Sequence, residues 1–203
     1  MEQNILFLFL LSSTALTLFP GPDILFVIST SLAQGWKKGF LVALGLCSGL
    51  VLHTLVVVFG LGSILQSLPQ AIRTIELLGA AYLLFIAFRI WHDNVKTLEH
   101  KNKKKITDSH YGTGFFMNFS NPKVSLFFIS FFPGFLFSEV LPYNQQFLIL
   151  GGIFLVQALL VFTTIAFLVD RLKKGFKIYV EGNFWKKIQV LVLVGIAFVL
   201  IYP

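Results

Sequence analysis

The sequence predicts an all-α polytopic membrane protein, in which six transmembrane helices form two inverted three-helix repeats with broken first and fourth helices. The first observation is composition: 56% of the 203 residues are apolar and 12% are charged, whereas an average soluble domain is about 25% charged. Mean hydropathy is +0.83. A globule of this length cannot bury so much apolar surface, so we expect neither a water-soluble enzyme, a secreted domain nor a disordered chain. The 24 Phe residues fit helices that face lipid.

The second observation is a set of six apolar stretches, each near the roughly 20 residues that a helix needs to cross a bilayer. They cover residues 5–31, 40–61, 71–90, 115–137, 147–169 and 188–201. The start of the chain has no positive charge and no small-residue cleavage site before Pro20, so we expect a retained helix and not a signal peptide. The stretches form a single membrane domain over residues 1–203, with repeats at about 1–90 and 113–203 and a polar linker at about 91–112.

The third observation is the placement of the positive charges. All but two of the 16 Lys and Arg residues lie in the loops after the first, third and fifth stretches; the first of these loops holds Lys37 and Lys38. Because Lys and Arg are enriched in cytoplasmic loops, we expect these loops to face the cytoplasm and both termini to lie outside. The basic run 101–105 could also bind anionic lipid or nucleic acid, but we interpret it as a topology signal and expect no nucleic-acid partner.

The first stretch is interrupted by Pro20-Gly21-Pro22, which is followed by Asp23. Proline lacks an N–H and clashes with the carbonyl one turn earlier, so the helix should break here. In lipid, the freed backbone groups must find partners or line a wet cavity, where a polar solute can bind. A charge within a span costs about 2.5–3.5 kcal/mol, so Asp23 should be paired or functional. An N-cap for the helix that restarts after Pro22 is the alternative role for Asp23.

The second stretch places Gly45, Gly49 and His53 four residues apart, which brings them near one face of a helix. A G-x-x-x-G pattern permits close helix approach, so we expect this face to point inward. His53, near the middle of the span, could relay protons or could simply hydrogen-bond a neighbouring helix. Cys47 is the only cysteine of the chain, which excludes an internal disulfide or dithiol redox cycle.

The third stretch contains Gly79, Ala80, Ala81 and Tyr82. Small residues at neighbouring positions let two membrane helices approach closely, so we expect this segment to serve packing.

The fourth stretch resembles the first at its break. Segments 19–23 and 119–123 share a Phe and a Pro at an offset of 100 residues, and the second segment ends in Asn121-Pro122-Lys123. Interrupted helices at corresponding positions of two halves point to a binding site in transporters built from inverted repeats. A simple proline kink without a ligand is the alternative at each position.

Asp23 and Lys123 each follow the proline of a break. At 1.5 Å of rise per residue, both charges fall in the cytoplasmic half of the membrane at comparable depths. An ion pair between them is therefore geometrically possible. Further polar residues cluster around the fourth-span break: Asn118, Ser120, Asn121 and Ser125.

The fifth stretch carries Gln157 near its middle, whereas the sixth has almost no polar features. We therefore expect the sixth helix to lie at the periphery of the bundle.

Taken together, these motifs resemble the LysE/RhtB family of bacterial amino-acid exporters over essentially the whole chain. The residues that carry the resemblance are 20–23, Gly45, Gly49, His53, 79–84, 114–118, 121–123 and the Phe-rich run to Phe132-Pro133. The resemblance implies export of an amino acid or a close derivative across the bacterial inner membrane, in exchange for protons. Carried to matching positions, it implies a substrate site at Gly21, Pro22, Asp23, Asn121, Pro122 and Lys123.

The expected partners are therefore an amino acid, protons and the lipid bilayer, with His53 and Asp23 as candidates for proton coupling. Walker, H-E-x-x-H and G-x-S-x-G motifs are missing from the sequence, so we expect no cofactor, no metal and no catalytic residue. The sequence leaves open the identity of the amino acid and whether the chain forms a homo-oligomer.

Two alternative functions belong to other classes of membrane protein. The chain could be an integral-membrane enzyme that uses Asp23, His53 and Lys123 as acid–base groups, although a second ionisable cluster near the lipid interface is missing. It could also be a membrane scaffold that transports nothing.

Overall fold

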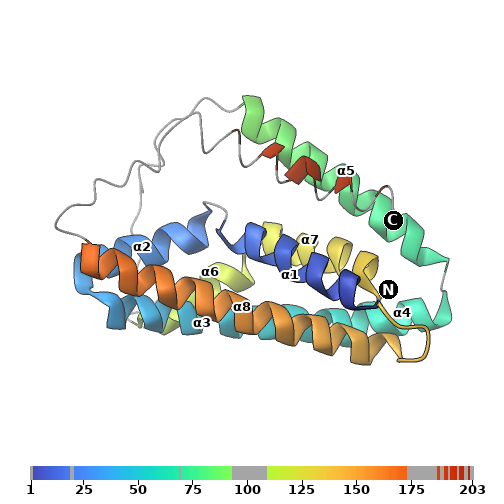
Figure 1. Cartoon of the computed structure of the whole chain (residues 1–203), viewed down its shortest axis with the longest axis horizontal. Coiled ribbons are helices and arrows are strands. Elements are labelled where there is room, and N and C mark those ends of the chain that lie inside the picture. Colours follow the sequence, from blue (N-terminus) through green and yellow to red (C-terminus); the bar gives the residue numbers. More distant parts are fainter. Residues whose placement is uncertain are drawn as a thin grey trace.

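The computed structural model describes residues 2–18, 21–68, 70–92 and 109–172, and in the C-terminal segment residues 187, 190, 191, 193–195, 197, 198 and 201. Every regular element in these residues is a helix (Figure 1). The predicted all-α class is therefore confirmed for the described part of the chain.

The first span is broken as expected. Helix α1 (Glu2–Leu18) and helix α2 (Pro22–Gln34) meet at a bend of 57°. Gly21 has an extended backbone and is the N-cap of α2. Pro22 is then the first helical residue, where its missing N–H removes no helical hydrogen bond. The N-cap role considered for Asp23 is wrong, because Gly21 holds that position and Asp23 lies in the first turn.

A single residue, Gly35, joins α2 to α3 (Trp36–Val56). Its φ of +87° is a conformation that glycine adopts without strain, so the chain reverses within one residue. Lys37 and Lys38, expected in a loop, therefore lie in the first turn of α3, where both are exposed. That expectation was wrong because no loop is needed at this turn.

Helix α3 continues through a π-helical turn, Val57–Leu61, into α4 (Gly62–Ser67). Helix α5 (Ala71–His92) follows. The guanidinium of Arg73 on α5 donates a hydrogen bond of 2.7 Å to the carbonyl oxygen of Ile201, which brings the C-terminal segment alongside α5 (Figure 1). Of the predicted sixth span, 188–201, residues 188, 189, 192, 196, 199 and 200 lie outside the described residues.

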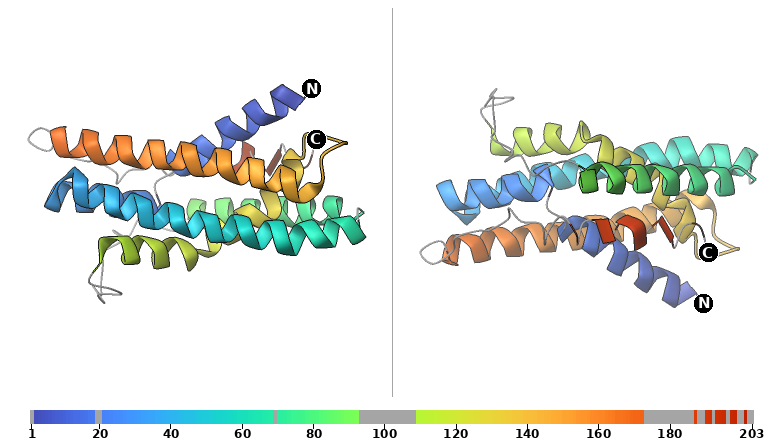
Figure 2. Two further views of the ribbon diagram at one scale, coloured as in Figure 1. Left: turned by 90° about the horizontal axis from the view of Figure 1, so that it is seen from below. Right: turned by 90° about the horizontal axis from the view of Figure 1, so that it is seen from above.

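The fourth span is also broken at its proline. Helix α6 (His110–Phe119) ends before Ser120, and α7 (Pro122–Phe131) begins two residues later. A 3-10 turn, Pro133–Phe135, leads toward α8 (Tyr143–Leu172). The two broken spans run in opposite directions along the bundle (Figure 2).

Three described helices are long and apolar enough to cross a membrane: Trp36–Leu65, Ala71–Arg89 and Tyr143–Leu172. The bent pair α1–α2 makes a fourth if it counts as one span. Helices α6 and α7 have 10 residues each, about 15 Å of length, so neither crosses alone. The complete six-helix inverted repeat stays a prediction.

Some of the phenylalanine side chains form a buried core and do not face lipid. The largest buried side chains include Phe9, Phe127, Phe128, Phe131, Phe132 and Phe147. The ring of Phe9 on α1 meets the ring of Phe131 on α7 at 5.8 Å between centroids. Others, such as Phe7 and Phe59, are 65% and 70% exposed. The expectation of lipid-facing phenylalanines is thus correct for the outer surface only, because α1, α7 and α8 pack through these rings.

Candidate functional site

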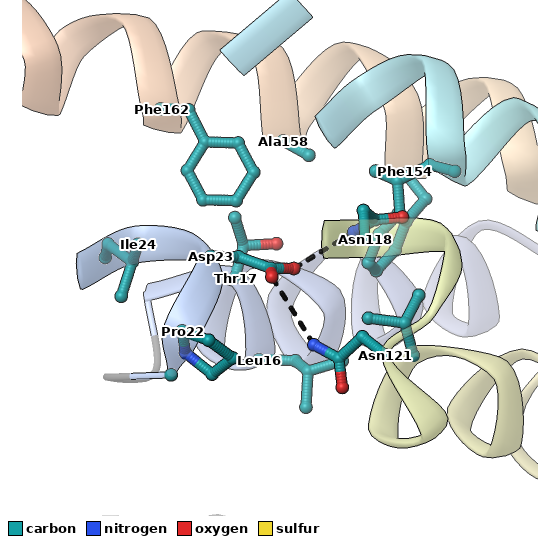
Figure 3. Close-up of a pocket in the computed structure, with 13 residues that line it drawn as sticks. Leu16, Thr17, Pro22, Asp23, Ile24, Asn118, Asn121, Phe154, Ala158 and Phe162 are labelled. Carbon is teal, nitrogen blue, oxygen red and sulfur yellow. Dashed lines mark hydrogen bonds between the residues drawn. The ribbon is translucent and has the colours of Figure 1, made fainter. Parts of the chain in front are cut away.

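A cavity of about 50 Å³ lies where the two helix breaks meet, with space for a few water molecules. It is enclosed by α1, α2, α3, the α6–α7 break and α8 (Figure 3). The lining residues are Leu16, Thr17, Gly21, Pro22, Asp23, Ile24, Leu50, Asn118, Asn121, Val124, Phe154, Ala158 and Phe162.

The carboxylate of Asp23 is the polar centre of this cavity. Its Oδ2 accepts a hydrogen bond of 3.0 Å from Nδ2 of Asn118, and its Oδ1 accepts one of 3.4 Å from Nδ2 of Asn121 (Figure 3). Asn118 lies in the last turn of α6, and Asn121 lies between α6 and α7. A charge at the first break is thus held by two amides at the second, and hydrogen bonds to an ionised group are stronger than neutral ones.

Asn118 is positioned by the close approach of α6 to α3. Its side chain is 1% exposed, and its Oδ1 is buried beside Gly49 without a hydrogen-bond partner. A Cβ at Gly49 would lie 2.6 Å from that oxygen, and a Cβ at Gly45 would meet the Tyr111 carbonyl oxygen. The absence of side chains on these glycines lets the helices touch, which confirms the inward face expected for the pattern.

His53 contacts the same asparagine from the other side. Its buried Nε2 lies 3.3 Å from the Asn118 carbonyl oxygen, to which it donates when protonated. The imidazole also packs against the rings of Phe119 and Phe128, at 6.1 and 5.7 Å between centroids. His53 does not line the cavity of Asp23; it lines a second one of about 210 Å³ between α3, its π-helical turn and α6–α7.

The structure brings together four of the predicted substrate residues: Gly21, Pro22, Asp23 and Asn121 line one cavity. Pro122 is placed as the first residue of α7, but its side chain and that of Lys123 lie outside the described residues. The expected ion pair between Asp23 and Lys123 is therefore untested.

Sequence reasoning missed the contribution of α8. Nε2 of Gln157 donates to Oγ1 of Thr17 at 2.8 Å, and Thr17 donates to the Ser13 carbonyl oxygen at 2.9 Å. Gln157 stood out as a polar residue in an apolar run, which was a usable signal. Ala158, the next residue, also lines the cavity, but in the sequence it looks like any packing residue, so no signal pointed to it.

Among the described residues, no group of three or more His, Cys, Asp or Glu side chains could hold a metal ion.

Comparison with known proteins gives consistent results. The family model described as LysE type translocator matches residues 14–203. The chain is 30% identical to a homoserine/homoserine lactone efflux protein of Salmonella typhimurium, over 84% of this chain and 83% of that protein. It is 29% identical to the membrane protein YrhP of Bacillus subtilis, over 89% of this chain and 90% of that protein. No solved structure matches.

A family match over nearly the whole length, together with apolar spanning helices and a polar cavity between two helix breaks, describes a membrane transporter and not an enzyme. The chain belongs to the LysE-type translocator family.

Proposed function

We propose that the chain exports an amino acid or a close derivative across the bacterial inner membrane in exchange for protons. The observation that carries this proposal is the Asp23 carboxylate, held by Asn118 and Asn121 in a cavity where two antiparallel broken spans meet. Transporters built from inverted repeats bind solute at such breaks. The efflux activity in the name of the Salmonella relative supports the same class of solute.

In this proposal the solute ammonium binds at Asp23 and Asn121, beside Gly21 and Pro22, which line the same cavity. Its carboxylate binds near the start of α7, at Pro122 and Lys123. The N-terminus of a helix favours a negative group through its unpaired N–H groups and its dipole. Each charge of the amino acid thus meets a complementary group from one of the two breaks.

Proton coupling is assigned to His53 and Asp23. Both contact Asn118, His53 through the main-chain carbonyl and Asp23 through the side-chain amide. A change of charge on either His53 or Asp23 would therefore alter a hydrogen bond to Asn118.

Counterflow in proteoliposomes tests the proposal. Vesicles loaded with one unlabelled amino acid should accumulate the same labelled amino acid, and Asp23→Asn should abolish this exchange. Glu139→Gln is the matched control, because it removes an exposed carboxylate far from either break. Chemical conversion of solutes without exchange would overturn the proposal.

A further inference from the structure

The cavity has one charged side and one apolar side. The apolar side is a face of α8 formed by Phe154, Ala158 and Phe162, spaced four residues apart (Figure 3). All three are nearly inaccessible to solvent, at 4%, 0% and 4% exposure. A solute whose ammonium binds Asp23 meets this wall together with four further apolar residues of the lining, Leu16, Ile24, Leu50 and Val124.

Charge limits what the rest of the solute can be. Asp23 is the single ionisable side chain among the described residues that line the cavity. A second cation on the solute, pressed against Phe154 and Phe162, would lose its water without gaining a counter-charge. The attraction of a cation to an aromatic face is weaker than this loss. Because Asp23 neutralises only one positive charge, a basic side chain is disfavoured.

Size is limited by Ala158. It is the smallest side chain of the wall, and it lines the cavity directly between two phenylalanine rings. A longer side chain at this position would occupy the same space of about 50 Å³, since packed neighbours leave it nowhere else to go.

We infer that the site takes α-amino compounds with a compact, uncharged side chain, and that Ala158 sets the upper size of that side chain. This inference rests on the proposed function and names its substrate class.

Two isosteric solutes test the charge requirement. Norvaline and 2,4-diaminobutyrate differ in whether the side chain ends in a methyl or an ammonium group. In counterflow with the wild-type chain, norvaline should compete with labelled solute at least about tenfold better, the order expected when a hydrophobic pocket selects. Equal exchange of both solutes overturns the inference but leaves amino-acid export intact. Exchange of no amino acid at all rejects the proposed function itself.

Graded variants test the size limit. Ala158→Val and Ala158→Leu should raise the KM for norvaline progressively, by about tenfold or more for Leu, while the KM for alanine changes much less. Val156→Leu is the control, because Val156 is on the same helix but 58% exposed. A merely structural role of Ala158 would change the rate for both solutes equally, and that result overturns the assignment. The Val variant keeps the test usable if the Leu variant does not fold.

Discussion

Asn118 is the residue that links the two helix breaks. Its amide nitrogen holds Asp23, its main-chain carbonyl faces His53, and its amide oxygen rests on Gly49. Three partners on two helices, α2 and α3, therefore depend on one buried residue, and any displacement of Asn118 reaches all of them.

Gly49→Ala is expected to move Asn118. A Cβ at this position would lie 2.6–3.1 Å from three atoms of the asparagine side chain, and overpacking of this kind costs about 1–3 kcal/mol. We expect a lower melting temperature in detergent and a slower counterflow rate. Gly152→Ala is the control, because a Cβ there meets no atom within 4 Å. Equal effects of the two substitutions would contradict this role of Gly49.

Asp23 and Lys123 are tested by comparing single and double variants. If the two groups form only a structural ion pair, each single change leaves a buried uncompensated charge, whereas the double change is tolerated. If they bind solute, Asp23→Asn with Lys123→Gln should insert stably and still fail to export. Restored efflux in the double variant would show that the pair holds helices together and does not contact solute.

The variant His53→Gln distinguishes a proton-coupling role of His53 from a purely structural role. Glutamine can still donate to the Asn118 carbonyl oxygen, but it does not titrate. We expect efflux to lose its dependence on a pH gradient while solute counterflow continues. Full retention of that dependence would identify His53 as a structural histidine.

Helix α8 is fixed at its start by a fully buried amide. Gln146 accepts from the N–H groups of Phe137 and Ser138, and it donates to the carbonyls of Ser138 and Leu141. This one side chain therefore holds residues 136–142, which form no helix or strand between the 3-10 turn and α8.

Gln146→Met should therefore destabilise the fold. It leaves buried backbone groups unpaired, and each such group costs about 1–3 kcal/mol. Thermal unfolding in detergent measures the loss, and Gln145→Met, at an exposed neighbouring position, is the control. A melting temperature equal to that of the control would show that water replaces the glutamine.

Among the elements, the breaks were predictable and their contacts were not. Proline at 22 and 122 dictates an interruption through local chemistry alone, and both helices restart at these prolines. The bond from Asp23 to Asn118 depends on how two helices are rotated toward each other, which local sequence does not encode. Gly35 shows the same limit. Lys37 and Lys38 suggested a loop between the first two stretches, but the positive φ of Gly35 lets the chain turn within one residue.

The ends of the bundle carry different charges. The α2–α3 turn with its two lysines and the end of α8 with Arg171 lie at one end, and the N-terminus lies at the other (Figure 1). Positive residues are retained on the cytoplasmic side, so we expect the end with the lysines to face the cytoplasm and the N-terminus to lie outside.

Reporter fusions test this orientation. A fusion at Pro203 and one within residues 99–105 should give opposite signals, external and cytoplasmic respectively. A reporter active in the cytoplasm at Pro203 would reject the six-span topology.

The π-helical turn Val57–Leu61 lies between two close contacts of the long helix. Before it, Gly49 faces Asn118 of α6, and after it, Gly62 faces Asn144 of α8. A π-helical turn holds one residue more than an α-helical turn. Deleting a single residue there would restore an uninterrupted α-helix and leave Gly62 facing α8 nearly as before, because the π-helical turn absorbs its extra residue locally. Natural variants that lack one residue are therefore expected at this turn, whereas a deletion elsewhere in α3 would rotate everything beyond it by about 100°.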